Sequence, residues 1–398
     1  MASQCIIVGG GPAGVMLGLL LARRGVGVSL LEAHDDFDRM FRGDTVHPSS
    51  LELLDQLGLA SRLLELDHAR LERMTLRSGD TQTTVADFSR LATPFPFIAM
   101  IPQTRFLELL IDEARRHDSF ELHMGARVEE LLREDDVVCG VRYRQRGETK
   151  TLRGDLTVGT DGRASQVRKL AGFVPRKLGA PMDVLWLVLP RDPGESASGL
   201  TGFRVGRGRL VVVLARADAW QLGYVILKGD GRTVREAGLD ALRNEVASLV
   251  PELADRVDAI ENWPDVHFLS VESSRVPRWH RPGLLVIGDA AHVMSPVGGV
   301  GINYAIQDAV ATANLLARPL LEGALDERHL AAVQRRREWP TRFIQSVQTV
   351  MQRQLVARAL RDAPFRLPWP ARVLPRIPLL RNVPARMVGW GVRPERIA

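Results

Sequence analysis

The chain has 398 residues, of which 45% are hydrophobic and 25% are charged, and its formal net charge is +6. These proportions are typical of a globular protein large enough for two domains, and they exclude a disordered chain. Its two cysteines, Cys5 and Cys139, exclude a disulfide framework, and no metal site is expected. No apolar run approaches the ~18 residues of a membrane span, and no signal peptide precedes the first strand, so we expect a cytoplasmic protein.

The chain opens with the pattern of a strand, a glycine turn and a helix. A short apolar strand is expected over residues 4–8, Gly9, Gly11 and Gly14 follow it, and a helix is expected through residues 17–21. Glycine at these positions permits a tight turn, a close approach of a pyrophosphate to the backbone, and close packing of the helix on the strand. The helix N-terminus also offers free N–H groups to an anion.

A second apolar strand, residues 26–31, ends at Glu32. An acidic side chain at this place can accept hydrogen bonds from both hydroxyls of an adenosine ribose and would repel a 2′-phosphate. The structural alternative is a merely tight turn between strand and helix. The strand before the glycines, the helix after them and the acid beyond favour dinucleotide binding.

Periodicity predicts the remaining elements. Helical patterns occupy residues 48–57, 103–116, 302–316 and 327–359. Between residues 176 and 275 the pattern changes to short apolar strands, at 184–189, 201–205, 209–215 and 220–227, followed by one helix at 234–249. The predicted class is α/β: a Rossmann-type nucleotide-binding domain with an inserted antiparallel β-sheet substrate domain and a helical C-terminal region. Such an inserted sheet can form the second wall of a ligand pocket.

Two later glycine motifs repeat the logic of the first. An apolar strand from residue 155 ends at Asp161-Gly162, and another, 284–287, ends at Gly288-Asp289. A glycine loop, 296–301, then leads into a helix. A carboxylate at a strand end can hold a sugar-alcohol hydroxyl, and a helix N-terminus can stabilise negative charge on a planar ring. Three such segments predict one extended cofactor, FAD.

At these motifs, over roughly residues 1–345, the chain resembles the single-component FAD-dependent aromatic hydroxylases, the group that includes p-hydroxybenzoate hydroxylase. With the strand pattern, the resemblance implies four segments: residues 1–175 and 276–360 form the FAD-binding domain, 176–275 the substrate-binding sheet domain, and 361–398 a basic, Pro-rich, hydrophobic tail.

The resemblance also implies roles for single residues. Asp289 would bind the ribityl or ribose region, Arg42 the pyrophosphate, and Gln103 the flavin chain, while residues 299–303 would lie along the pyrimidine edge of the ring. The predicted FAD-binding residues are Gly9, Gly11, Pro12, Ala13, Gly14, Glu32, Arg42, Gln103, Asp161, Asp289, Pro296, Gly299, Gly301, Ile302 and Asn303. Arg163 and Arg168 are predicted for the nicotinamide and phosphate region.

The chemistry that the resemblance implies is oxygen insertion. NADPH or NADH reduces FAD, O2 adds to the reduced ring to give a hydroperoxide, and the distal oxygen hydroxylates or epoxidises an electron-rich carbon. The cofactor performs the difficult step, so no catalytic triad is predicted. His47 is the side-chain candidate for a catalytic role, and its alternative is an ordinary helix entry.

Other residues have two interpretations each. Trp186, Phe203, Trp220 and Tyr224 lie on the predicted sheet and line the substrate pocket unless they belong to the core. His292 is interpreted as a hydrogen-bonded structural residue, and the run 335–337 as a solvated helix face.

The tail carries all of the excess charge. Residues 361–398 contain eight arginines against Asp362 and Glu395, which equals the net charge of +6. Prolines exclude one long helix. The tail is therefore either a strap packed on the body or a peripheral foot on an anionic membrane, which would make the protein membrane-associated. No nucleic-acid-binding module accompanies the basic residues.

The predicted function is a monooxygenase acting on an electron-rich aromatic, such as a lipophilic alkyl- or prenyl-bearing phenol, quinol or quinolone. Two alternatives remain: an isoprenoid double-bond reductase like the geranylgeranyl reductases, which share the three motifs, and a non-catalytic FAD-binding protein. The tryptophan-rich segment of the flavin-dependent halogenases is not seen, so halogenation is not expected.

Overall fold

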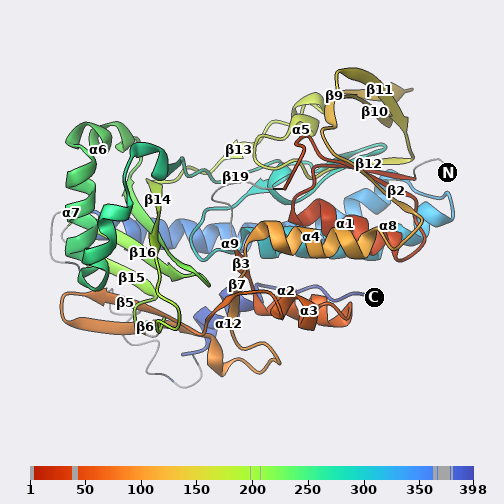
Figure 1. The fold of residues 1–398 in the computed structure, drawn as a ribbon. Coiled ribbons are helices and arrows are strands. Elements are labelled where there is room, and N and C mark those ends of the chain that lie inside the picture. The colour runs from red at the N-terminus through yellow and green to blue at the C-terminus, as the bar shows by residue number, and fades with distance from the viewer. Residues whose placement is uncertain are drawn as a thin grey trace.

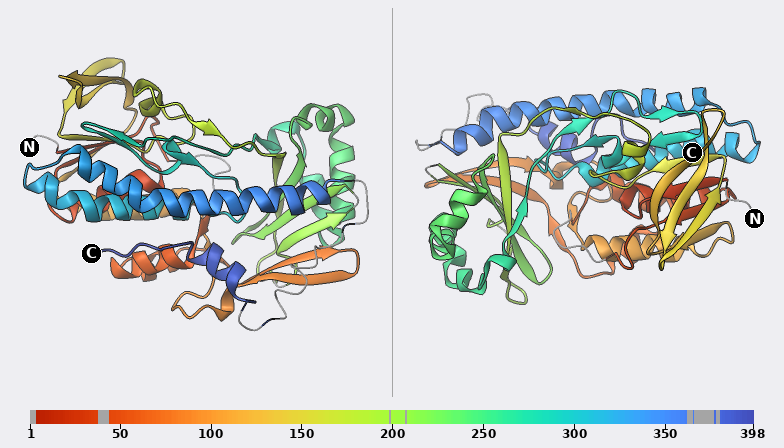
Figure 2. Two further views of the ribbon diagram at one scale, coloured as in Figure 1. Left: turned by 180° about the vertical axis from the view of Figure 1, so that it is seen from behind. Right: turned by 90° about the horizontal axis from the view of Figure 1, so that it is seen from above.

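The structure is a computed structural model that describes residues 4–37, 44–197, 199–206, 208–361, 365, 377 and 380–398. A six-stranded sheet with its helices forms one half of the molecule, and a seven-stranded sheet with α6 and α7 forms the other (Figure 1). The long helix α9 runs along both halves, as the view from behind shows (Figure 2). The predicted α/β class is confirmed.

The six-stranded sheet carries the first glycine motif. Its strand order is β20-β21-β12-β1-β2-β8, and all neighbours are parallel except β20 and β21. The strands are β1 Cys5–Val8, β2 Val28–Leu31, β8 Phe120–His123, β12 Leu156–Gly159, β20 His280–Arg281 and β21 Leu284–Val286. Every residue of β1 and β2 is buried, as expected for the central strands of a parallel sheet. The carboxyl ends of β1, β12 and β21 lie side by side, so the three motifs meet at one edge.

Helices α1, α4 and α8 pack together beside this sheet. They span Pro12–Ala22, Gln103–Ala114 and Gly301–Leu321. Ala13–Ala22 of α1 are all buried, as expected for a helix that is apolar on every side. The helix predicted from residue 103 is confirmed, and the one predicted from residue 302 extends further than expected.

The seven-stranded sheet has the order β18-β14-β17-β16-β15-β5-β6. The strands are β5 Arg73–Ser78, β6 Thr81–Asp87, β14 Met182–Pro190, β15 Gly202–Gly206, β16 Arg209–Ala215, β17 Ala219–Leu227 and β18 His267–Leu269. The four strands predicted here are confirmed. Strands β5 and β6, which were not predicted, join the sheet from far upstream, with β5 parallel to β15. Most of their residues are polar, so the two strands gave no apolar strand signal.

The prediction of one continuous helix over residues 234–249 is wrong. The segment forms two helices, α6 Gly231–Ala237 and α7 Leu239–Leu249, with Gly238 between them at a φ of +95°. That backbone conformation interrupts a right-handed helix and favours glycine. Helix α7 then packs its Leu242 and Val246 on the sheet.

The remaining elements are smaller. Three-stranded sheets are formed by β3 Thr45–Val46, β4 Ala69–Leu71 and β7 Ile98–Met100, by β9 Arg127–Glu134, β10 Val137–Gln145 and β11 Glu148–Arg153, and by β13 Arg176–Lys177, β19 Ser274–Arg275 and β22 His292–Val293. The short helices are α2 Pro48–Gln56, α3 Ala60–Leu64 and α5 Gln166–Leu170. Single turns of 3-10 helix cover Phe88–Arg90, Trp263–Asp265 and Gly288–Ala290, and a longer one covers Pro251–Ala259.

Helix α9 spans Glu327–Met351, and a π-helical segment, Gln352–Val356, and α10, Ala357–Ala359, continue it. Helix α12, Val383–Gly389, follows near the end of the chain. Among the residues that the structure describes, no helix is both long and apolar enough to cross a membrane.

The last residues of the chain form a strap, which we call the carboxyl-terminal strap and define as residues 390–398. The Trp390 Nε1 donates to Glu52 of α2 at 2.8 Å, and the Asn314 amide of α8 donates to the Arg396 carbonyl at 2.7 Å. Arg24 of α1 donates to the carbonyl of Ala398 at 2.8 Å. This part of the tail therefore matches the packed-strap alternative. Most of residues 362–379 lie outside the described residues.

Candidate functional site

The glycine turn after β1 has two close contacts and one open space. A Cβ atom on Gly14 would lie 2.0 Å from the Gly9 carbonyl oxygen, and one on Gly9 would lie 2.6 Å from the Cα of Asp161. A Cβ on Gly11 would meet nothing within 4 Å, and no side chain of the described residues caps α1. An open, uncapped helix N-terminus at Gly11 fits the pyrophosphate of a dinucleotide.

Glu32 lies beside this turn, immediately after β2. Its Oε2 accepts a hydrogen bond from the backbone N–H of Gly10 at 2.8 Å, and its Oε1 accepts one from that of His34 at 2.9 Å. The side chain is 3% exposed. Glu32 is thus held against the turn, at the place predicted for the ribose acceptor, while Pro12 and Ala13 open α1.

Asp161 follows β12 and organises the start of α5. Its Oδ2 accepts from the backbone N–H groups of Gln166 and Val167 at 2.6 and 2.9 Å, and its Oδ1 accepts from the Ser165 hydroxyl. Burial raises the pKa of Asp161, and these hydrogen bonds oppose that rise. The adjacent Thr160 hydroxyl lies 2.7 Å from the Gly9 carbonyl oxygen. The second motif therefore packs directly against the first.

Arg168 joins the second motif to the third. Its guanidinium is buried and donates to the Ala290 carbonyl at 3.0 Å, to that of Asp289 at 3.3 Å and to that of Arg163 at 2.6 Å. The side chain of Arg163 itself is exposed. Of the two arginines predicted for the nicotinamide region, Arg168 holds the cofactor turns together and Arg163 faces solvent.

The third motif turns at Gly288, which has a φ of +59°. A Cβ on Gly288 would lie 3.4 Å from the Cβ of Ala13, so the turn lies against the start of α1. The backbone N–H of Gly288 donates to the Asp308 carboxylate at 3.0 Å. Asp289, at the centre of the turn, is half-buried. All three motifs thus meet, as the FAD prediction requires.

The loop of residues 296–301, which we call the ring loop, leads into α8. Gly298 and Gly299 have φ values of +84° and +63°, and the Gly299 N–H donates to the Pro296 carbonyl at 3.0 Å. Helix α8 begins at Gly301, with no side-chain cap among the described residues. An uncapped N-terminus favours a negatively charged group, so Gly301 and Ile302 are suitably placed for the pyrimidine edge of a flavin.

Asn303 behaves differently from its neighbours. Its side chain is fully buried, and its Oδ1 accepts from the hydroxyls of Ser49 at 2.7 Å and Ser50 at 2.9 Å. The side chain therefore ties α8 to α2.

His47 also contacts the ring loop, from β3 and α2. It is fully buried, and its Nε2 lies 3.0 Å from the Gly299 carbonyl oxygen while its Nδ1 lies 2.8 Å from that of Val388 in α12. Thr45 donates to the same Gly299 oxygen at 3.2 Å. Burial lowers the pKa of His47, although the two carbonyls favour its charged form. In the structure both ring nitrogens of His47 face backbone carbonyl oxygens, so the side chain supports the loop, and its catalytic role stays a prediction.

Gln103 begins α4, and its backbone N–H donates to the Asp44 Oδ1 at 3.3 Å. The Asp44 Oδ2 lies 3.2 Å from Arg216, which comes from the turn between β16 and β17. Burial raises the pKa of Asp44 and Arg216 opposes that rise. This ion pair, which the sequence analysis did not identify, joins the two halves. Arg42 lies outside the described residues.

The four aromatic pocket candidates lie on opposite faces of the seven-stranded sheet. Trp220 and Tyr224 are buried in the core that includes α7, where they contact Glu195 and Glu245. Trp186 and Phe203 are half-buried on the other face, which we call the inner face, and the ring-loop residue Val297 packs on the same cluster. Trp220 and Tyr224 are therefore core residues, and Trp186 and Phe203 remain pocket candidates.

The interpretation of the run 335–337 as a solvated helix face is correct for Arg335, which is exposed, and wrong for Arg337. Arg337 is 0% exposed and its Nε donates to the Asp308 Oδ1 at 2.9 Å. Its spacing from Leu330, Val333 and Ile344 places it on the buried stripe of α9, which is the signal that could have identified it. His292 is a hydrogen-bonded structural residue as predicted, since its Nε2 lies 2.6 Å from Asp308.

Comparison with known proteins agrees with this geometry. Residues 2–347 match the family described as FAD binding domain. A 6-methylpretetramide 4-monooxygenase of Streptomyces rimosus is 35% identical over 400 residues, which cover 98% of this chain and 93% of that protein.

Two solved structures share the fold. PqsL of Pseudomonas aeruginosa, in complex with 2-aminobenzoylacetate, has a TM-score of 0.77 at 22% identity, covering 89% of this chain and 97% of that one. The OxyS anhydrotetracycline hydroxylase of Streptomyces rimosus has a TM-score of 0.76 at 22% identity, covering 99% and 77%. With the family match and the meeting of three glycine motifs, these findings identify the chain as a member of the FAD-dependent aromatic monooxygenases.

Proposed function

We propose that the chain uses NADPH or NADH as electron donor and inserts one oxygen atom of O2 into an extended aromatic substrate, held between the ring loop and the inner face of the seven-stranded sheet. An aromatic polyketide is the preferred class. Alkyl- or prenyl-bearing phenols, quinols and quinolones are the second. The observation that carries the proposal is the 35% identity to a 6-methylpretetramide 4-monooxygenase over nearly the full length of both chains.

The inner face supports an apolar, planar substrate. Trp186 lies over Gly223 of β17, where a Cβ would come within 3.0 Å of the indole, and Phe203 lies on the same face. Val297 extends this surface onto the ring loop. Flat aromatic side chains that are half-buried can stack on a substrate ring without leaving a buried polar group unpaired.

Bound FAD would supply electron transfer and oxygen activation. The Gly11 turn would hold its pyrophosphate, Glu32 its adenosine ribose, and Asp289 its ribityl chain. The uncapped N-terminus of α8 would stabilise negative charge on its pyrimidine edge. The protein otherwise orients the substrate and excludes water, so no acid–base residue is assigned.

The sequence has no second glycine motif of the GxGxxG type that could bind the nicotinamide cofactor. Arg163 is exposed beside the second motif, next to the predicted FAD site, and is our candidate for its phosphates. Replacing it should raise the KM for NADPH or NADH with little change in FAD content.

The test is oxygen consumption by purified holoenzyme with NADPH or NADH. Aromatic polyketide phenols, alkylquinolones and simple phenols would be compared, and the product mass measured under isotopically labelled O2. We expect substrate-stimulated oxygen uptake and one labelled oxygen atom in the product, with polyketide phenols the best. Phe203→Ala should raise the substrate KM more than the KM for the nicotinamide.

Other results would overturn parts of the proposal. Anaerobic saturation of an alkene, with no oxygen insertion, would assign the chain to the reductase alternative. Turnover with reduced free flavin but not with NADPH or NADH would remove the nicotinamide from the reaction. A higher rate with alkylquinolones would replace the substrate class.

A further inference from the structure

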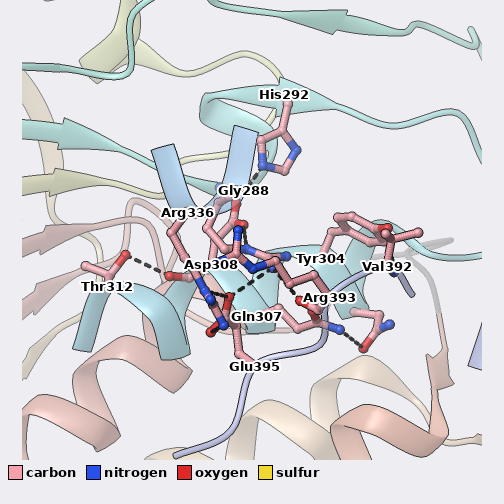
Figure 3. Close-up of polar contacts among 12 residues, drawn as sticks. Gly288, His292, Tyr304, Gln307, Asp308, Thr312, Arg336, Val392, Arg393 and Glu395 are labelled. Carbon is pink, nitrogen blue, oxygen red and sulfur yellow. Dashed lines mark hydrogen bonds and ion pairs between the residues drawn. The ribbon is translucent and has the colours of Figure 1, made fainter. Parts of the chain in front are cut away.

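A buried chain of four ionisable side chains connects the third cofactor motif to the carboxyl-terminal strap (Figure 3). The His292 Nε2 lies 2.6 Å from the Asp308 Oδ2, and the Asp308 Oδ1 accepts from the Arg337 Nε at 2.9 Å. The Arg337 Nη1 lies 3.3 Å from the Glu395 Oε1. None of these four side chains is more than 7% exposed. The chain passes from β22 through α8 and α9 to the carboxyl-terminal strap.

The inner end of this chain contacts the cofactor turn. The Asp308 Oδ2, which lies against His292, also accepts the backbone N–H of Gly288 at 3.0 Å. Gly288 immediately precedes Asp289, the residue expected to bind the ribityl chain. The orientation of the Asp308 carboxylate therefore bears directly on the shape of the turn.

The outer end depends on the strap. Glu395 accepts two hydrogen bonds from Arg336, at 2.8 and 3.0 Å, and lies beside Arg337. His292 and Arg337 hold the pKa of Asp308 below its ordinary value against the opposing effect of burial, so Asp308 is a carboxylate. A buried arginine that loses one of two carboxylate partners becomes an undercompensated charge, and its neighbours must shift to solvate it.

We propose that the carboxyl-terminal strap is a positioning element of the cofactor site. Glu395, acting through Arg337 and Asp308, holds the Gly288-Asp289 turn in the shape that binds FAD. Docking of the strap and binding of FAD are therefore coupled, and each strengthens the other. This inference needs the chain to bind FAD at that turn but is independent of the substrate and of the nicotinamide.

The first test compares Glu395→Ala with Glu322→Ala as matched control. Glu322 is also a carboxylate paired with an arginine, Arg318, but the pair is exposed at the end of α8. Apoprotein would be titrated with FAD, and Tm measured with and without it. We expect Glu395→Ala to raise the Kd for FAD about tenfold and to shrink the rise in Tm that FAD causes. Glu322→Ala should leave both unchanged, and Glu395→Asp should restore part of the affinity.

A purely structural strap would give a different result. Glu395→Ala would then lower the Tm of apoprotein and holoprotein equally, with an unchanged Kd for FAD, and the proposal would be wrong.

The second test uses the unaltered full chain. Because coupling between two sites is reciprocal, FAD should slow backbone hydrogen exchange in residues 391–398. Exchange at the same rate with and without FAD would overturn the coupling. Neither test measures turnover, so failure of the proposed substrate or electron donor would leave both results interpretable.

Discussion

The two walls of the proposed site are shaped by different parts of the chain. One wall is formed by the three glycine motifs, and we call it the cofactor wall. Its shape is set by the backbone, since Gly9 and Gly14 make contacts that exclude a Cβ atom and Gly11 borders open space. The other wall is the inner face of the seven-stranded sheet, which we call the sheet wall, and its shape is set by side chains. Trp186 and Trp220 lie on neighbouring strands, but only Trp186 points to the inner face, whereas Trp220 lies in the core on the opposite face. Where the backbone sets the shape, only certain residue types fit, so the wall can be recognised in the sequence. Where side chains set the shape, the wall depends on which face of the sheet packs against which other element.

The largest expected effect would test the division of the sheet wall. Trp220→Ala removes a fully buried indole and should lower the free energy of unfolding by about 3–5 kcal/mol. Trp186→Ala removes a half-buried one and should cost about 1–2 kcal/mol while raising the KM for substrate. Urea unfolding and steady-state kinetics would measure both. If Trp220→Ala changed KM with little loss of stability, the two faces would be assigned the wrong way round.

The next effect separates folding from cofactor binding within the glycine turn. Gly14→Ala would bring a Cβ against the Gly9 carbonyl and should destabilise the apoprotein by about 3 kcal/mol. Gly11→Ala has an extended backbone and open space, so apoprotein stability should stay within about 0.5 kcal/mol while the Kd for FAD rises. Unfolding of apoprotein and FAD titration would be compared. Unchanged FAD affinity in Gly11→Ala would place the pyrophosphate elsewhere.

The smallest effect concerns His47, which supports the cofactor wall through a side chain. Burial lowers the pKa of His47 in the folded protein below its ordinary value of 6.5. Below pH 6.5 the unfolded chain therefore binds a proton that the folded chain does not, and stability falls as pH falls until the lowered pKa is reached.

In that window His47 should contribute a loss of at most about 1.4 kcal/mol for each pH unit. His47→Gln should flatten that part of the Tm profile, with the contributions of other histidines unchanged. A variant profile parallel to the wild-type one would show that the two carbonyls keep His47 charged.

The cofactor wall could be predicted from the sequence because the three distant motifs share one feature, a turn directly after a buried strand. Gly9, Asp161 and Gly288 each follow a buried apolar strand, and parallel strands bring their carboxyl ends to one edge. The cofactor followed from that arrangement, and the family from the resemblance of the three motifs. The inserted sheet was predicted from its alternating strands, although its partners β5 and β6 were missed.

What could not be predicted depended on partners far away in the chain. Arg337 lies in a run of three arginines, which is typical of a protein surface. It is buried because it forms ion pairs with Asp308 of α8 and Glu395 of the strap. The composition of the tail fits both a packed strap and a membrane-binding segment, and only the packing of residues 390–398 on α2 and α8 distinguishes the two.

The sequence by itself determined the glycine turns, the buried strands and the presence of the FAD site, since backbone geometry and periodic apolar burial restrict residue types locally. Only the tertiary structure decided which face of the sheet meets the ring loop, which charges are buried, and where the strap lies. The alternation of side chains along a strand defines two faces of the sheet but does not tell which element packs on each face. A charged side chain can be buried only where a partner, here distant in the chain, compensates its charge.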